Sequence, residues 1–151
     1  MLKWISFCLL LIAAANANAL DRDQAEKAVE VREAVMTITG WNIVPAAGMV
    51  KEKIPYDARE FQIHAERLNF AMSMVADAFK TDTRGFGLKT EALDKVWEDN
   101  EEFLRLTKEA VDASAALAAA AANGNFEEVK GPFMEMGKAC KACHDDFREE
   151  D

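Results

Sequence analysis

The chain has 151 residues, of which 27 are acidic and 18 are basic, and its formal net charge is −9 at pH 7. Such an acidic protein repels phosphate groups instead of releasing counterions from them, so the composition excludes nucleic-acid binding. If charge steers the encounter with a partner protein, we expect that partner to be basic.

The first residues have the composition of a secretory signal peptide. Lys3 precedes an apolar run at 5–15, and the Ala-Asn-Ala sequence at 17–19 is typical of a cleavage site. The apolar run is shorter than the stretch of about 20 residues that crosses a bilayer, and no second run follows it. We therefore expect residues 1–19 to be removed on export to the periplasm.

The remaining residues, 20–151, are expected to form a single domain that does not insert into the membrane. Cleavage removes Lys3 and no acidic residue, so the net charge changes from −9 to about −10.

The first predicted helix follows an acidic cap, Asp21 or Asp23, and carries two adjacent apolar stripes. One stripe contains Ala28, Val31, Val35 and Ile38, and the other contains Ala25, Val29, Arg32 and Met36. Gly40 and Pro45 are expected to bend or end this helix, because proline removes a backbone donor. Since the two stripes together are wider than the face that one bundle buries, they predict a homodimer.

The next two helices are predicted from regular apolar spacing. The second has apolar residues at Phe61, Ala65, Leu68, Met72, Val75 and Phe79. The third is expected to begin near Thr90 and to end at Asn123-Gly124, with apolar positions at Trp97, Leu104, Val111, Ala115 and Ala118. Its alanine-rich last third reflects either high helix propensity or room for a bulky neighbour, and we expect the second.

The fourth helix begins at Asn125 and Glu128, a pair typical of a capping box. Its apolar stripe is Phe126, Val129, Phe133, Met136, Cys140, Cys143 and Phe147. Gly131-Pro132 predicts a kink or a late helix start. The fold expected from these segments is an all-α, antiparallel four-helix bundle.

The sequence Cys140-Lys141-Ala142-Cys143-His144 has three interpretations. A thioredoxin-like disulfide pair belongs with a βαβ pattern, which is absent here. A structural zinc site needs four ligands, and His64 is the one other cysteine or histidine in 20–151. His64 lies at the edge of an apolar face, so we expect a flanking residue there and not a ligand.

The third interpretation is covalent haem attachment. Two cysteines three residues apart project from one face of a helix, where each can form a thioether to the haem edge. His144 follows at once, so its imidazole can reach the iron. Export and the apolar stripe around both cysteines agree with haem c.

These residues, with four stretches of surrounding sequence, resemble the class II c-type cytochromes, the cytochrome c′ family. The stretches are Ala28-Val29-Glu30-Val31-Arg32, Pro55-Tyr56-Asp57-Ala58, Val96-Trp97 with Phe103, and the run from Cys140 to Arg148. The resemblance implies a four-helix bundle around one covalent haem c with its iron, usually in a homodimer formed through the first two helices.

The resemblance makes His144 the proximal ligand and places Met36 on the opposite side of the iron. In cytochromes c′ proper that opposite position is empty, and the iron binds small gases such as nitric oxide and carbon monoxide. In low-spin relatives a methionine binds the iron there, and the protein is an electron carrier. We expect a redox-active, gas-binding protein; the alternative is a pure electron carrier with His144 and Met36 as ligands. Neither is an enzyme.

The resemblance also implies roles for three residues around the haem. Arg32 corresponds to an arginine that pairs with a haem propionate, the alternative being an exposed surface charge. Arg148, one helical turn beyond His144, corresponds to an arginine on the proximal side, the alternative being a solvated cation at a helix C-terminus. Met72 is expected to pack against the haem.

Overall fold

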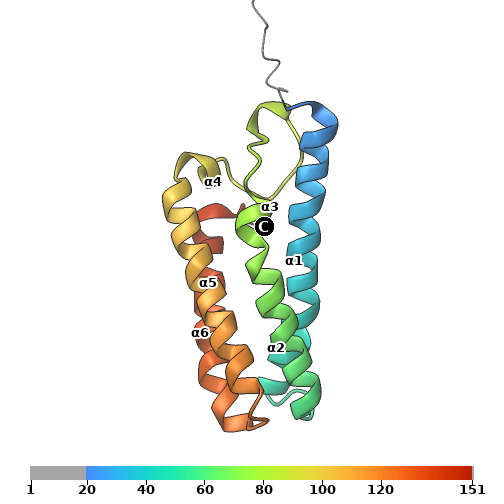
Figure 1. Ribbon diagram of the computed structural model, residues 1–151, viewed down its shortest axis with the longest axis vertical. Coiled ribbons are helices and arrows are strands. Elements are labelled where there is room, and N and C mark those ends of the chain that lie inside the picture. Colours follow the sequence, from blue (N-terminus) through green and yellow to red (C-terminus); the bar gives the residue numbers. More distant parts are fainter. Residues whose placement is uncertain (1–19, 151) are drawn as a thin grey trace, which may run out of the picture.

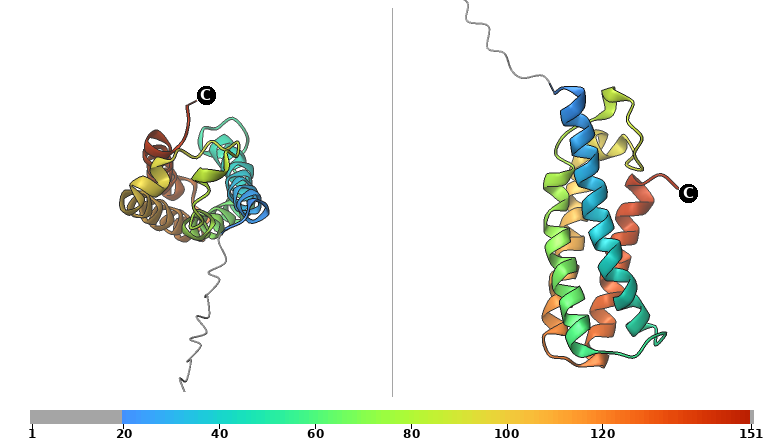
Figure 2. Two further views of the ribbon diagram at one scale, coloured as in Figure 1. Left: turned by 90° about the horizontal axis from the view of Figure 1, so that it is seen from above. Right: turned by 90° about the vertical axis from the view of Figure 1, so that its right-hand side faces the viewer.

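The computed structural model describes residues 20–150, which form four long helices and the segments that connect them (Figure 1). The elements are α1 (Arg22–Val50), α2 (Ala58–Ser73), α3 (Val75–Ala78), the 3₁₀ turn η1 (Arg84–Phe86), α4 (Lys95–Glu98), α5 (Asn100–Ala121) and α6 (Phe126–Phe147). Successive long helices run in opposite directions, as Figure 2 also shows. The predicted all-α antiparallel four-helix bundle is therefore confirmed. The predicted signal peptide, 1–19, lies outside the described residues.

The described part of the chain contains no helix long and apolar enough to span a membrane. Its long helices pack as neighbours in the order α1, α2, α5 and α6, whereas α1 and α6 meet only sparsely. The helices of this bundle are therefore tightly packed against each other on three sides and loosely packed between α1 and α6, where its internal space lies.

Helix α1 begins at a capping box in which Asp21 accepts from the Gln24 backbone N–H at 2.8 Å, so Asp21 is the cap and not Asp23. The prediction that Gly40 or Pro45 ends this helix is wrong, because α1 continues to Val50. An interior proline costs about 3 kcal/mol. Burial of Ala46 and Met49 beyond the proline offsets that cost.

The predicted apolar stripe of the second helix is confirmed, although two helices share it. Helix α2 ends at Ser73, Met74 forms a turn, and α3 continues the same stripe. The buried members are Phe61, Ala65, Leu68, Met72, Val75 and Phe79.

The third long helix differs from its prediction in start and in face. Helix α5 begins at Asn100, ten residues after the predicted Thr90, because Asp99 has a non-helical backbone between α4 and α5. Its buried side is Phe103, Leu106, Thr107, Ala110, Ser114, Leu117 and Ala121, whereas the predicted Leu104 is exposed. The buried face is therefore offset by one residue from the predicted one.

Helix α6 begins at Phe126, where the Asn125 side chain accepts from the Glu127 backbone N–H at 3.0 Å. The late start predicted from Gly131-Pro132 is wrong, since Pro132 lies inside a continuous helix. The Asn125 side-chain amide donates to Glu128 Oε1 at 3.0 Å, so Asn125 is the cap, but the pair meets through its side chains and not through the backbone bonds of a capping box.

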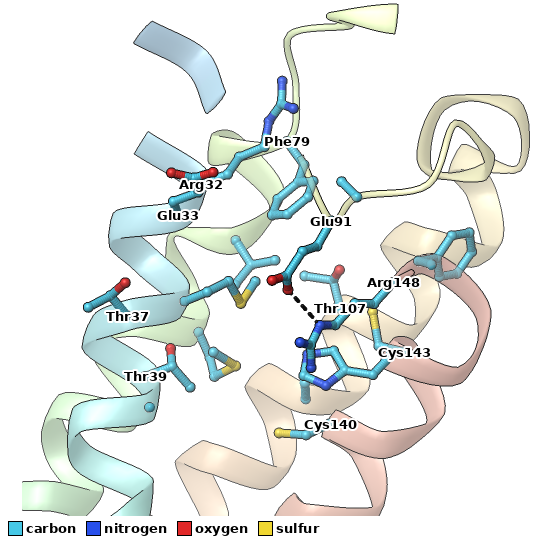
Figure 3. Close-up of a pocket in the computed structure, with 18 of the residues that line it drawn as sticks. Arg32, Glu33, Thr37, Thr39, Phe79, Glu91, Thr107, Cys140, Cys143 and Arg148 are labelled. Atoms are coloured by element: carbon cyan, nitrogen blue, oxygen red, sulfur yellow. Dashed lines mark hydrogen bonds and ion pairs between the residues drawn. The ribbon is translucent and has the colours of Figure 1, made fainter. Parts of the chain in front are cut away.

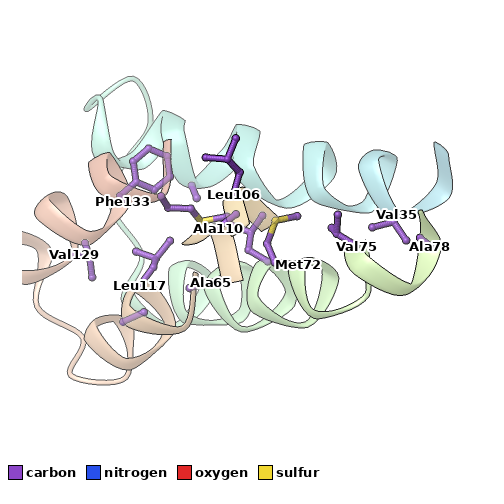
Figure 4. Packing of buried hydrophobic residues seen from close by; sticks show 14 of the residues in the cluster. Val35, Ala65, Met72, Val75, Ala78, Leu106, Ala110, Leu117, Val129 and Phe133 are labelled. Carbon is purple, nitrogen blue, oxygen red and sulfur yellow. The ribbon is translucent and has the colours of Figure 1, made fainter. Parts of the chain in front are cut away.

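The hydrophobic core follows the bundle axis and has an aromatic cluster toward each end. Figure 4 shows its middle, where Met72 and Val75 lie opposite Leu106 and Ala110. One aromatic cluster contains Tyr56, Phe61, Phe126 and Phe133. The other contains Phe79, Phe103 and Phe147. The second cluster lies beside the end of α6 that carries the cysteines.

Candidate functional site

A cavity of about 600 Å³ lies between α1 and the C-terminal half of α6 (Figure 3). It has the size of a small-molecule or cofactor pocket. Cys140, Cys143 and His144 all line it, as predicted for a site built on this motif. The other predicted site residues that line it are Arg32, Met36, Met72 and Arg148. Residues far apart in the sequence are thus brought to one cavity.

The two cysteines are free thiols at the cavity wall. Burial raises the pKa of Cys140. Burial, and then the charges of Cys140 and Asp146, raise the pKa of Cys143 to about 11. Both thiols are therefore protonated at neutral pH, unlike the thiolates of redox-active cysteine pairs. The described residues contain no cluster of metal-ligating side chains that supports the zinc interpretation.

His144 projects from the last full turn of α6 at the mouth of the cavity. The residue is exposed overall, yet its ring is partly desolvated by the cavity wall. This desolvation, followed by the charge of Arg148, lowers the pKa of His144, while Asp145 and Glu91 oppose the shift. The imidazole is therefore neutral at physiological pH, which is the form that binds a metal.

The lining supplied by α1, α2 and α3 is mixed, because α1 contributes Arg32, Glu33, Thr37 and Thr39 besides its apolar side chains. Met36 and Ile43 come from α1, while Met72 and Val75 come from α2 and α3. Met72 is buried, whereas Met36 is partly buried and packs against the core. The thiols and the imidazole of the motif thus share the cavity with four apolar side chains of α1, α2 and α3, while Arg32 and Glu33 of α1 add charge to its lining.

Arg32 is 2% exposed, so the alternative of a surface charge is wrong. All three guanidinium nitrogens donate to protein oxygens, namely the Ala78 carbonyl at 3.2 Å, the Thr83 hydroxyl at 3.1 Å and the Thr81 carbonyl at 2.7 Å. The guanidinium carbon also lies 5.4 Å from the Phe79 ring centre and 4.8 Å from that of Trp97.

In Figure 3 the Arg32 side chain extends past Phe79, away from Cys140. Arg32 therefore ties the segment after α3 to α1 at the rim of the cavity. Burial lowers the pKa of its guanidinium, and the nearby Asp82 opposes that shift. The carbonyls and aromatic faces around it stabilise the buried charge.

Arg148 reaches the site by contacts that differ from the predicted ones. Helix α6 ends at Phe147, and Arg148 has an extended backbone, so it does not continue the helical face of His144. It still reaches the cavity, because it pairs with Ala92 in an antiparallel bridge and its Nε donates to Glu91 Oε2 at 2.8 Å. The side chain is 39% exposed at the end of α6, so it keeps partial contact with solvent, as in the alternative, while it also lines the cavity.

Several cavity residues were not predicted, among them Glu33, Thr37, Thr39, Glu91 and Thr107. Glu91 lies in an irregular segment and reaches the site only through the end of α6, so no local pattern identifies it. Thr107 is a polar residue on the buried side of α5, and this position within an apolar stripe is a signal that could have found it.

Other sequence expectations concern residues that lie away from the cavity. His64 pairs with Asn42 at 3.0 Å between α1 and α2 and does not line the cavity, so the ligand interpretation of His64 is wrong. Among the described alanines of α5, only Ala110 lines the cavity. It precedes the alanine-rich stretch, so the expectation of a bulky neighbour beside that stretch is wrong.

The sequence profile of the family described as Cytochrome C′ matches residues 27–148. The chain belongs to the cytochrome c′ family. Cytochrome c-554 from Cereibacter sphaeroides is 30% identical over 142 residues, which cover 93% of this chain and 92% of that protein.

Solved structures of family members show the same fold. Cytochrome c prime from Shewanella frigidimarina has a TM-score of 0.80 and 29% identity, over 86% of this chain and 100% of that one. A nitric oxide complex of a cytochrome c prime mutant from Alcaligenes xylosoxidans has a TM-score of 0.76 and 28% identity, over 84% of this chain and 97% of that one.

Proteins of the cytochrome c′ family carry covalently bound haem c with its iron, and the cavity fits this group. Two protonated thiols and a neutral imidazole face an apolar space of suitable size. Thr107 adds a further sign, because it is 4% exposed and its hydroxyl has no protein hydrogen-bond partner. A buried hydroxyl without a partner costs about 1–3 kcal/mol. A bound group that brings a polar atom, or a water, can satisfy it.

Proposed function

We propose that this chain is an exported haem c protein of the cytochrome c′ type, with Cys140 and Cys143 as thioether attachment points and His144 as the proximal ligand. The observation that carries the proposal is that one cavity contains both thiols, the neutral imidazole and the apolar side chains of Met36, Ile43, Met72 and Val75. When bound, haem c supplies a one-electron iron couple and a coordination site for small gases.

The residues of the chain perform three tasks in this proposal. The cysteines fix the cofactor to α6, so that loss by dissociation is prevented. His144 stays neutral because its ring is partly desolvated and Arg148 lies near it. The side chains of Met36, Ile43, Met72 and Val75 exclude water and charged ligands from the far side.

The four apolar side chains favour a small uncharged ligand beside them. One structural relative was solved as a nitric oxide complex and another as a carbon monoxide complex, both of cytochrome c prime from Alcaligenes xylosoxidans. We propose that this chain binds nitric oxide and carbon monoxide on the Met36 side and also cycles between redox states. No enzymatic reaction is part of the proposal.

A second candidate function rests on Met36 itself. Its side chain lines the same cavity as His144, so a thioether is available where a sixth ligand is needed. If that sulfur binds the iron, the gas site is closed and the protein is a low-spin electron carrier.

Visible spectra of the purified protein, oxidised and reduced, with and without carbon monoxide, distinguish these functions. A high-spin ferrous spectrum that carbon monoxide shifts supports the gas-binding proposal. A low-spin spectrum that the gas leaves unchanged supports the electron carrier. A protein without haem contradicts both.

We also propose a homodimer formed through α1. Four apolar side chains on this helix are exposed, with Trp41 at 76%, Val44 at 70%, Ile38 at 45% and Val31 at 44%. Val31 and Ile38 belong to the first of the two predicted stripes, of which Val35 is buried in the core of the bundle. Such a patch is typical of a protein interface.

The periplasm is the proposed location, on the basis of the composition of residues 1–19. The acidic charge of the chain favours a basic redox partner. Amino-terminal sequencing of the exported protein tests the location, since cleavage after residue 19 is expected and an intact amino terminus would contradict it.

A further inference from the structure

A short segment, which we name the strap (residues 91–95), is fixed to the end of α6. The Leu93 N–H donates to the Phe147 carbonyl at 3.0 Å, and the Glu149 N–H donates to the Glu91 carbonyl at 2.8 Å. These two backbone bonds hold the strap antiparallel to the residues that follow α6. The position of the strap relative to the cavity is therefore set by backbone geometry.

Two ion pairs add side-chain contacts between the strap and α6. Glu91 Oε2 lies 2.8 Å from Arg148 Nε, and Lys95 Nζ lies 2.9 Å from Asp146 Oδ1. All four side chains are partly exposed, so each pair contributes only about 0–1 kcal/mol to stability. Stability alone does not distinguish the two pairs.

Their positions relative to the cavity do distinguish them. Glu91 and Arg148 both line the cavity that contains His144, whereas Lys95 and Asp146 do not line it. Figure 3 shows the Glu91–Arg148 pair at the cavity beside Cys143. One of the two ion pairs of the strap therefore contacts the site, and the other supplies a comparison within the same segment.

We propose that Glu91 is a positioning residue: it holds the Arg148 guanidinium at the His144 side of the cavity and balances its charge there. The inference rests on the proposed function, since it concerns the haem that His144 binds. Its consequence is that the Glu91–Arg148 pair sets the reduction potential of the iron.

Coulomb's law gives the sign of each effect. A cation near the iron favours the ferrous state, which has one positive charge fewer, and an anion favours the ferric state. Because Glu91 and Arg148 are paired at the same cavity, their effects on the iron oppose each other. Both side chains line the cavity that contains His144, so both charges lie at the site of the iron.

The simpler alternative is that Glu91 only fastens the strap. Glu91→Gln and Lys95→Gln then act alike, because each removes one ion pair of similar length and exposure from the same segment. The charge-balance inference predicts different signs for the two variants. Lys95→Gln removes a cation and leaves Asp146 unpaired, so it cannot raise the potential.

The experiment is a redox titration of the haem-loaded, full-length exported protein and its variants. We expect Glu91→Gln to raise the midpoint potential, Arg148→Gln to lower it, and the double variant to return it close to the wild-type value. Glu91→Asp keeps the charge and is expected to stay near wild type. Lys95→Gln is expected to lower the potential or leave it unchanged.

The inference is overturned if Glu91→Gln leaves the potential unchanged, or if Glu91→Gln and Arg148→Gln shift it in the same direction. If Glu91→Gln does not assemble with haem, the other two variants test the inference. It is overturned if Arg148→Gln does not lower the midpoint potential. It is also overturned if Glu91→Asp changes the midpoint potential. A wild-type protein that lacks haem overturns the proposed function instead, so the two failures are distinguishable.

Discussion

Arg32→Leu tests the account of the most deeply buried charge in the described structure. The substitution removes the hydrogen bonds to the Ala78 and Thr81 carbonyls and to the Thr83 hydroxyl, together with the contacts to two aromatic rings. Each buried acceptor left without a donor costs about 1–3 kcal/mol. Burial of the new leucine side chain offsets this cost by about 1.5–3 kcal/mol.

The expected net loss in the free energy of unfolding is about 2–4 kcal/mol, at the lower end if water reaches the partly exposed Thr81. Urea denaturation of the haem-loaded protein measures it, provided that the slope of the transition is unchanged. Arg105→Leu is the matched control, because Arg105 pairs with Glu102 and Glu109 on the exposed face of α5. That control is expected to cost less than about 0.5 kcal/mol.

The proposed role of Arg32, which is to tie the segment after α3 to α1, would be refuted by either of two results. One is a decrease in the free energy of unfolding below about 1 kcal/mol in Arg32→Leu, and the other is an equal decrease in Arg32→Leu and Arg105→Leu. The family role of Arg32 as a propionate partner makes a separate prediction. If Arg32 also pairs with a propionate, Arg32→Leu lowers the free energy of unfolding more in the haem-loaded protein than in the haem-free protein. If Arg32 makes only the protein contacts, the decrease is the same in both.

Four further predictions concern other parts of the bundle. If the gas site is open, the ferrous spectrum is high-spin in both the wild type and Met36→Ala. A low-spin spectrum in the wild type that becomes high-spin in Met36→Ala would show that the sulfur was bound. Trp41→Glu converts the dimer into a monomer in sedimentation velocity, and a wild-type protein that is already monomeric at micromolar concentration contradicts the proposed interface. Burial lowers the pKa of His64, so as pH falls the unfolded state takes up the proton first, at about 6.5. The free energy of unfolding should therefore fall below that pH, and urea titrations should show a smaller fall in His64→Gln. Gly137 lies exposed inside α6 and an added Cβ would meet open space; Gly137→Ala should raise the free energy of unfolding by about 0.5–1 kcal/mol, and a lower urea midpoint would contradict this.

The sequence predicted those features that depend on local chemistry. The Asp21 and Asn125 caps, the apolar stripe of α2 and the grouping of Cys140, Cys143 and His144 at one cavity all follow from spacing along a single helix. These features need no knowledge of how the helices pack, because each is determined within a few turns.

The errors arise where packing decides between local alternatives. Apolar residues occur in adjacent pairs along α5, such as Phe103-Leu104 and Leu117-Ala118, so two faces satisfy the same periodicity. Contact with α2 and α6 selects the face that contains Phe103. Pro45 was expected to bend or end α1, but the helix continues to Val50, because the burial of residues beyond the proline favours it.

The surroundings of the two arginines could not be predicted, because they involve residues distant in sequence. Arg32 is fixed by the segment 78–83, and Arg148 by the strap. Helical spacing placed Arg148 on the face of His144, yet α6 ends one residue earlier. Its place at the cavity results from the bridge to Ala92, for which the sequence contains no signal.

Mass spectrometry of the exported protein under denaturing conditions tests the central claim most directly, because only a covalent haem survives unfolding. The account predicts a single species with the mass of residues 20–151 plus one haem, and predicts that Cys140→Ala together with Cys143→Ala abolishes the addition. A bare polypeptide, or one lighter by two hydrogens because the cysteines form a disulfide, would contradict it.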